Sequence, residues 1–344
     1  MRKLLFGIAL WLVSPWAWAS FRAADFVIVP AAAAAPGLQN ATWRTDVEIM
    51  NVDEVPVDVM IVFLPTGNIN NTYWFDNFAY HLGGRSEDGF TKVDPKLKDI
   101  QPGRSVVLEN IIEGNWGANS MGALLIWAYK AGSFKQTTPP GGEPRKILVW
   151  SRTYNKKTAE DGTVSTFGQS IPGIPWYYYI DAHKQPQGLN KVVFSGIRED
   201  AAFRTNIGLV NISDRLTSLE VELTLYGADG TKLKDLGVVL SPLAHEQFDQ
   251  AVKSGLFRLE NDLTFGTLEI TVKAWRSTAA EPTPALLAYV SRVDNATNDA
   301  VYLEQTYTKE FPWDCVFNGN CSASAATALG LVPARVRPLA PPHP

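Results

Sequence analysis

Residues 43–52 read Trp-Arg-Thr-Asp-Val-Glu-Ile-Met-Asn-Val, and residues 203–212 read Phe-Arg-Thr-Asn-Ile-Gly-Leu-Val-Asn-Ile. Both stretches share an Arg-Thr pair followed by apolar residues at every second position, which is the pattern of a strand with one buried face. An internal repeat of this kind means that one structural unit occurs twice in the chain. The sequence is therefore expected to fold as two related β-rich parts.

The repeat continues beyond these strands. Four further blocks recur in the same order: 57–63 with 219–225, 102–112 with 242–252, 122–126 with 266–270, and 149–155 with 289–295. Asp-Gly pairs at 161–162 and 229–230 are typical of tight hairpin turns between strands. Many short strands separated by such turns predict an all-β fold of two tandem antiparallel β-sandwich domains. The Cys-Trp-Cys core of immunoglobulin domains is missing, so immunoglobulin-like can describe only the layered topology.

The blocks set the expected boundaries. Domain one is predicted over residues 24–172 and domain two over 189–307, joined by a linker at 173–188 that is rich in Pro and aromatic residues. Domain one carries an aromatic insertion at 65–101, about 22 residues longer than the matching stretch of domain two. The tail at 308–344 is rich in Ala and Pro and is expected to be disordered.

The N-terminus has the features of an export signal. A positive start at Arg2 and Lys3 precedes a short apolar core, and Ala17 and Ala19 supply a small-x-small cleavage pattern, which predicts a signal peptide over residues 1–19. No later stretch is long and apolar enough to span a bilayer. The mature protein is expected to be secreted to the periplasm or the outside of the cell, where Cys315 and Cys321 would form one local disulfide.

Two short motifs resemble a known group of proteins. The Arg-Thr-Asp/Asn strand ends in an Asn-containing turn, and Ser-Arg-x-x-Asn recurs at 151–155 and 291–295. This pattern is similar to uncharacterised secreted bacterial tandem β-sandwich (immunoglobulin-like) repeat proteins, over roughly residues 25–307. The resemblance implies export and the layered fold, and it brings no known activity.

The charge and the motifs of the sequence argue against several classes of function. The chain has 31 basic and 35 acidic residues, a net charge of −4 and no basic stripe, which argues against a nucleic-acid partner. Ser170 lacks the Gly-x-Ser-x-Gly spacing of a hydrolase elbow. The histidines, including His245, show no metal-ligand spacing and are expected to be solvated. We therefore predict no catalytic residues, no metal ligands and no cofactor, although a carboxylate pair from distant segments stays open.

Paired arginines and an acidic loop leave two minor alternatives. Arg44 with Arg152 and Arg204 with Arg292 occupy matching places in the repeat, where bridging between strands or sheets is favoured over reading a ligand carboxylate. The loop at 294–299 offers oxygen ligands for calcium, but a hairpin stabilised by Asx-type side-chain bonds is favoured, because it explains this loop and the matching loop after Asn155.

The sharpest difference between the copies is a face of domain one. Trp127 and Tyr129 stand where domain two has Thr271 and Lys273, so the outer face of domain one is apolar. The insertion, the linker aromatics at 176–179 or a partner could cover this face. The candidate binding residues are Tyr73, Trp74, Phe75, Tyr80, Trp127 and Tyr129.

These features give one leading hypothesis and two alternatives. The leading hypothesis is an exported, non-catalytic protein for binding, adhesion or surface assembly, with a protein or carbohydrate partner at the cell surface. The first alternative is an extracellular glycan-active enzyme with two carboxylates about 5–10 Å apart in a cleft between the domains. The second is a purely structural spacer, which requires a covered outer face and no sizeable pocket. Solvent exposure of Trp127 separates the leading hypothesis from the spacer.

Overall fold

The computed structural model describes residues 22–37, 42–67, 95–133, 142–158 and 161–307. Within them nearly every element is a β-strand, and all pairings between the named strands are antiparallel, which confirms the all-β expectation. The predicted signal peptide, Tyr73, Trp74, Phe75, Tyr80, Cys315, Cys321 and the tail lie outside the described residues. No helix in the described segments is both long and apolar enough for a membrane crossing.

The elements fall into a first half (residues 24–172), a connecting segment (173–188) and a second half (189–307). The first half contains β1 (Phe26–Pro36), β2 (Thr42–Asn51), β3 (Val57–Pro65), η2 (Pro95–Leu97), β4 (Ser105–Leu108), α2 (Ile111–Trp116), β5 (Ser120–Lys130), β6 (Ile147–Thr158) and β7 (Val164–Pro172). The connecting segment contains β8 (Ile174–Pro175) and η3 (Ala182–Gln187). The second half contains β9 (Lys191–Glu199), β10 (Phe203–Asn211), β11 (Thr217–Gly227), β12 (Lys232–Leu240), β13 (His245–Phe248), β14 (Leu263–Ser277), β15 (Leu286–Asp294), β16 (Ala300–Glu304) and β17 (Thr306–Tyr307).

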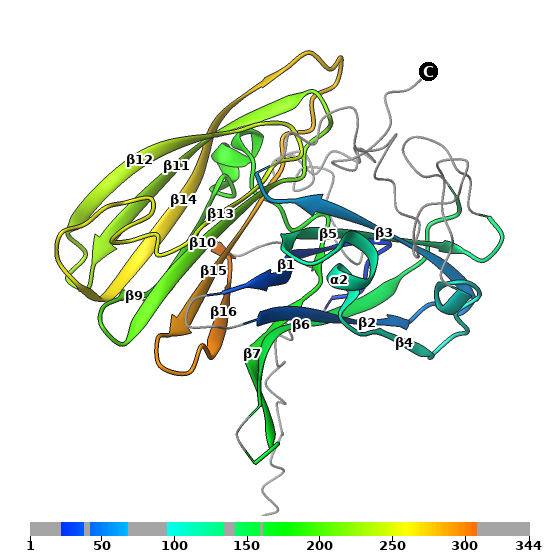
Figure 1. Cartoon of the computed structure of the whole chain (residues 1–344). Coiled ribbons are helices and arrows are strands. Elements are labelled where there is room, and N and C mark those ends of the chain that lie inside the picture. The colour runs from blue at the N-terminus through cyan, green and yellow to red at the C-terminus, as the bar shows by residue number, and fades with distance from the viewer. Residues whose placement is uncertain (1–21, 38–41, 68–94, 134–141, 159–160, 308–344) are drawn as a thin grey trace, which may run out of the picture.

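The repeat is visible in the pairing order. β2 lies between β4 and β6 in the first half, and β10 lies between β13 and β15 in the second. β5 likewise lies between β1 and β3, and β14 lies between β9 and β11. β7 follows β6 as β16 follows β15. The five sequence blocks therefore correspond to strands with equivalent neighbours (Figure 1).

Each half packs its strands in layers. In the second half a four-stranded sheet (β13, β10, β15, β16) faces a five-stranded sheet (β12, β11, β14, β9, β17), and alternate residues such as Ile207, Val221 and Phe194 are buried. In the first half β1 joins both layers, because it pairs with β5 along its length and with β2 at Ala35 and Pro36. An irregularity between Val29 and Ala32 breaks the ladder with β5 at Pro30, a position where a proline without an N–H is tolerated.

The apolar outer face predicted for the first half is covered. Trp127 is 3% exposed and Tyr129 is 2% exposed, and Met60, Val62 and Leu125 on the same two strands are buried as well. Phe26 on the neighbouring strand stacks on Trp127, with ring centroids 4.4 Å apart and planes 5° from parallel. Strands β3 and β5 are thus buried on both faces, so Trp127 and Tyr129 present no surface to a partner.

The match between the two Ser-Arg motifs is offset by one residue in the structure. Arg152 pairs with Asp46, whereas Arg292 pairs with Thr205. Because side chains alternate between the faces of a strand, the two arginines lie on opposite faces of equivalent strands. Arg292 reaches across to the other sheet and donates to the Gly196 carbonyl at 3.2 Å, while Arg152 bonds the exposed Thr166 hydroxyl at 2.9 Å. The bridging interpretation is therefore confirmed for Arg292.

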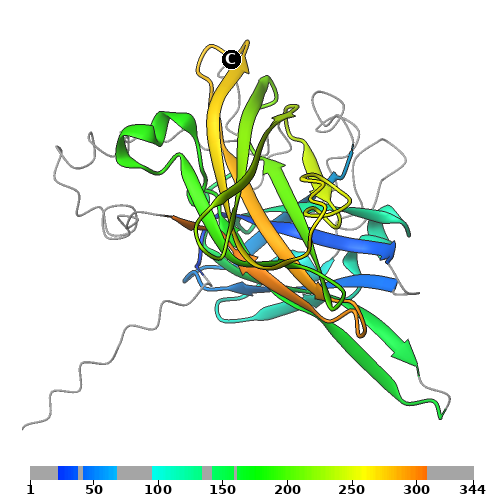
Figure 2. The ribbon, with the colours of Figure 1, turned by 90° about the vertical axis from the view of Figure 1, so that its left-hand side faces the viewer.

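The connecting segment is bonded to both halves. Trp176 donates through Nε1 to Asp25 at 3.1 Å, and the Tyr178 hydroxyl donates to the Gln305 carbonyl at 3.1 Å. Ile180 exchanges two backbone hydrogen bonds with Leu286, each 2.9 Å long. The two halves therefore meet along an extended seam, and the hairpin of β6 and β7 projects away from it (Figures 1 and 2).

Candidate functional site

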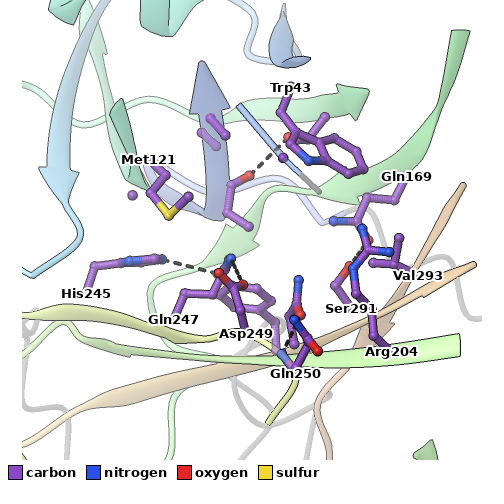
Figure 3. A pocket seen from close by; sticks show the side chains of 18 of the residues that line it. Trp43, Met121, Gln169, Arg204, His245, Gln247, Asp249, Gln250, Ser291 and Val293 are labelled. Atoms are coloured by element: carbon purple, nitrogen blue, oxygen red, sulfur yellow. Dashed lines mark hydrogen bonds between the residues drawn. The ribbon is translucent and has the colours of Figure 1, made fainter. Parts of the chain in front are cut away.

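A cavity of about 190 Å³ lies in the seam between the halves (Figure 3). One wall comes from β1, β2, β5, β6 and β7 of the first half, and the other from β10, β13, β15 and the turn after β13. Side chains that can contact a ligand are contributed by Trp43, Met121, Thr153, Gln169, Arg204, Asn206, His245, Gln247, Asp249, Gln250, Tyr289, Ser291 and Val293. The second half uses the outer face of its four-stranded sheet, because its inner face forms the core.

His245 lines this cavity and is held in place by hydrogen bonds to the first half. Its side chain is 1% exposed and crosses the seam to the first half. Nε2 lies 3.1 Å from the Pro30 carbonyl oxygen, and Nδ1 lies 2.6 Å from the Thr66 hydroxyl. A carbonyl only accepts, so Nε2 carries the proton and Nδ1 accepts from Thr66. The neutral imidazole thus connects the second half to β1 at Pro30, where the pairing of β1 with β5 is interrupted.

The same histidine starts a chain of hydrogen bonds that ends at the rim of the cavity. The Tyr289 hydroxyl lies 3.3 Å from His245 Nε2 and donates to Gln247 Oε1 at 2.8 Å. Gln247 donates in turn from Nε2 to Asp249 Oδ1 at 2.8 Å. Burial lowers the pKa of His245 to about 4 and raises that of Tyr289 above its usual range. Both side chains are therefore neutral at physiological pH, which agrees with Tyr289 donating its hydroxyl proton to Gln247 and with Nδ1 of His245 acting as an acceptor.

Gly208 makes room for this arrangement. It pairs with Tyr289 across the ladder, and a Cβ at position 208 would lie 2.0 Å from the tyrosine ring. The equivalent position of the first half is Glu48, which faces Trp150. The second half therefore has a glycine under an aromatic ring where the first half has a charged residue, and this allows its outer face to pack against the first half.

Arg204 is the buried cation of the cavity. It is 6% exposed, and its guanidinium donates to Asn295 Oδ1 at 3.0 Å and Asn298 Oδ1 at 2.9 Å. Burial lowers its pKa from the usual value, but the residue stays charged. Among the described residues no carboxylate lies within ion-pair distance of it.

The loop that holds Arg204 is stabilised by hydrogen bonds to the side chain of Asp294. Asp294 Oδ1 accepts from the Ala296 and Thr297 backbones at 2.9 and 2.8 Å and from the Thr297 hydroxyl at 2.9 Å. These bonds lower the pKa of Asp294. The Asx-type hairpin predicted from the sequence is confirmed in the second half. The described segments bring no three His, Cys, Asp or Glu side chains together in a metal-binding arrangement.

The first half supplies an aromatic side chain and an amide. Trp43 is half-buried at the start of β2 and lies across the cavity from Gln247, Asp249 and Gln250 (Figure 3). Gln169 on β7 is 7% exposed, and its Oε1 accepts from the Ser291 hydroxyl at 2.8 Å across the seam. The cavity therefore combines one aromatic surface with planar polar groups from both halves.

Most of these residues were not candidates in the sequence. Trp127 and Tyr129 line no part of the cavity, and His245 is buried where a solvated side chain was expected. Arg204 was noted only as one of a repeated pair. A comparison of the outer faces of β2 and β10 gives the missed signal, because Glu48 becomes Gly208 there. Asp249 is the one carboxylate among the residues lining the cavity, so a paired-carboxylate mechanism lacks its second acid at this site.

Comparisons with known proteins add little. No family model matches the chain, and no curated protein matches it. Matching solved structures include the β-glucuronidase 2 of Bacteroides uniformis bound to cyclophellitol-6-carboxylate aziridine, a β-glucuronidase of the same organism, and a calcium-binding mutant of β-glucuronidase 2. Each is 12% identical over 76% of this chain, with a TM-score of 0.16, and this chain spans 24% of each. At that TM-score the likeness supports no conclusion about fold or function.

Proposed function

We propose that this is an exported, non-catalytic binding protein of duplicated β-sandwich domains that recognises a carbohydrate at the cell surface through the cavity between its halves. The observation that carries the proposal is the composition of that cavity. Trp43 lies on one side, and polar side chains that include Gln169, Arg204 and Asn206 line other parts of the cavity. Binding sites for small molecules typically join an apolar or aromatic surface with a few convergent polar groups in a concave space.

The chemistry of the lining favours a sugar over other small ligands. A pyranose ring has an apolar face that can lie against an aromatic ring, and its edge carries hydroxyls that need planar, fixed hydrogen-bond partners. Amide and guanidinium groups provide such partners. A purely apolar ligand would leave several buried polar groups without partners, which is costly.

The alternatives fit less well. A spacer accounts for the covered face around Trp127 but predicts no sizeable pocket. A glycan-active enzyme of the usual kind needs two carboxylates, and the cavity contributes only Asp249. The export part of the proposal is supported by the N-terminal pattern of residues 1–19.

The test is a glycan-binding screen with the exported chain and two tryptophan variants. Trp43→Ala removes the aromatic surface of the cavity and is expected to weaken binding about tenfold or more, since stacking and aromatic burial are lost. Trp150→Ala is the matched control, because Trp150 lies in the same half, on the neighbouring strand β6, and outside the cavity lining. Glycan binding that is absent from the wild type, or is equal in the two variants, would contradict the proposal.

A further inference from the structure

Two side-chain amides that line the cavity, those of Gln169 and Asn206, accept hydrogen bonds from the protein through their oxygens. Gln169 Oε1 accepts from the Ser291 hydroxyl at 2.8 Å. Asn206 Oδ1 accepts from the Gln250 backbone N–H at 3.1 Å. A side-chain amide has one carbonyl oxygen and one NH₂ group. Both residues are therefore left with their NH₂ donors to offer to a ligand.

Arg204 adds further donors to the same wall. A guanidinium has five N–H donors, and the hydrogen bonds of Arg204 to Asn295 and Asn298 use only part of that capacity. Those two amide oxygens are neutral, and among the described residues no carboxylate forms an ion pair with the guanidinium. Burial lowers its pKa, and Asp249 and Asp294 lie near enough for their charges to oppose that shift. A buried cation that lacks a direct ion pair gains from a ligand that brings a carboxylate within hydrogen-bond distance.

The acceptors of the cavity lie elsewhere. Gln247 is engaged at its oxygen by Tyr289 and through its NH₂ group by Asp249. Asp249 is exposed at the rim, so water screens its charge, whereas Arg204 and Gln169 are 6% and 7% exposed. The buried part of the cavity is thus rich in donors and poor in acceptors.

We infer that the ligand is a sugar residue that carries a carboxylate, as a uronic acid does. The carboxylate would accept from Arg204, the carboxylate and the ring oxygens together would accept from Gln169 and Asn206, and the ring would lie against Trp43. This inference rests on the proposed function and specifies its ligand. The size agrees, because a cavity of about 190 Å³ is smaller than the roughly 300–1,000 Å³ of pockets for drug-sized ligands and suits one residue rather than a longer chain.

A carboxylic acid without a sugar ring fits the hydrogen-bond donors of the cavity less well. An aromatic acid would satisfy Trp43 and Arg204, but it concentrates its acceptors at one end of the molecule. The donors here come from two strands on different sides of the seam, with Gln169 on β7 of the first half and Arg204 and Asn206 on β10 of the second. A sugar spreads oxygens around its ring and can meet donors from several directions.

Two nearly isosteric substitutions test the inference. Gln169→Glu and Asn206→Asp replace each NH₂ donor with an oxygen and keep the oxygen that accepts from Ser291 or the Gln250 backbone. Binding of glucuronate and galacturonate, compared with glucose and galactose, is measured by calorimetric titration of the whole exported chain. We expect the wild type to prefer the acidic sugars, and each substitution to weaken their binding about tenfold or more because two negative groups then face each other.

Controls separate the possible failures. Gln101→Glu adds the same charge at an exposed position away from the cavity and is expected to leave binding unchanged. Thermal melting confirms that each variant is folded. Neutral sugars that bind as tightly as acidic ones, or acidic sugars that bind equally to wild type, Gln169→Glu and Asn206→Asp, would overturn the inference and leave the proposed function intact. Failure of both sugar classes in the wild type would overturn both.

Discussion

The contact between Gly208 and Tyr289 gives the sharpest expectation for a single residue. A methyl group at position 208 would overlap the tyrosine ring, which also holds the hydrogen-bond chain from His245 to Gln247. Gly208→Ala is therefore expected to destabilise the protein by about 1–3 kcal/mol, as overpacked cores do. Urea denaturation measures the change in the free energy of unfolding.

Gly237→Ala is the control for that substitution. Gly237 lies in β12, where the nearest atom to a new Cβ is the Val221 carbonyl oxygen at 4.0 Å. Without a clash, the alanine only reduces the freedom of the unfolded chain, so stability should stay unchanged or rise slightly. Equal effects of the two substitutions would show that the ring of Tyr289 does not fill the space above Gly208.

His245 makes stability depend on pH. Its pKa falls from 6.5 in the unfolded chain to about 4 in the folded protein, because burial opposes the charge. Between these values the unfolded chain binds the proton and the folded protein does not, so stability is complete above about pH 6.5 and is lost as the pH falls toward 4. The gap corresponds to about 3 kcal/mol.

Chemical denaturation at pH 7 and pH 4.5 tests this expectation in the wild type and in His245→Gln. The groups that face the imidazole are the Pro30 carbonyl, the Thr66 hydroxyl and the Tyr289 hydroxyl, and none of them is charged at these pH values. The variant should lose less stability than the wild type on acidification. An identical loss in both proteins would assign the acid sensitivity to other residues.

Because Arg152 on β6 and Arg292 on β15 lie on opposite faces of equivalent strands, their removal should affect stability differently. Arg292 spans the two sheets of the second half to reach the Gly196 carbonyl, whereas Arg152 lies on an outer face against Thr166. Arg292→Ala should cost about 1.5–3 kcal/mol, the usual range for a hydrogen bond to a charged group. Arg152→Ala should change stability by no more than about 0.5 kcal/mol. Thermal melts of the two variants compare them, and equal shifts would refute the offset.

The strands themselves were predictable because their sequence pattern is local. Alternation at 57–63 and 219–225 identified β3 and β11, and the Asp-Gly pair at 229–230 identified the turn between β11 and β12. The register of β15 was not predictable from matching Ser-Arg strings, since pairing depends on the partner strand. The burial of Met60 and Val62 on the outer face of β3 was not predictable either. Alternation shows that one face of a strand is buried, and it does not show what covers the other face.

The site was beyond the sequence because it exists only where the halves meet. Trp43 and Gln169 come from the first half, and Arg204 and Tyr289 come from the second, with no spacing that links them along the chain. Their meeting depends on the outer face of β10 packing against β1, which Gly208 permits. Comparing the two copies face by face points to that surface, but only the folded chain shows that it closes a cavity.

The seam predicts that the whole molecule unfolds as one unit. It includes buried side-chain bonds at His245 and Ser291 and the backbone pair of Ile180 with Leu286, so separating the halves would expose many polar groups at once. Far-ultraviolet circular dichroism follows strands in both halves. Tryptophan fluorescence reports mainly on the first half and its neighbouring segment, because Trp275 is the only described tryptophan in the second half. Both signals should change at the same denaturant concentration.

Thr66→Val extends the test to the seam itself. The substitution leaves Nδ1 of His245 buried without its donor, which costs about 1–3 kcal/mol. Thr66 belongs to the first half and His245 to the second, so in a cooperative molecule both signals should shift together to lower denaturant concentration. Two separate transitions in the wild type, or a shift of the fluorescence signal alone in the variant, would mean that the halves unfold independently and that the cavity between them can open without global unfolding.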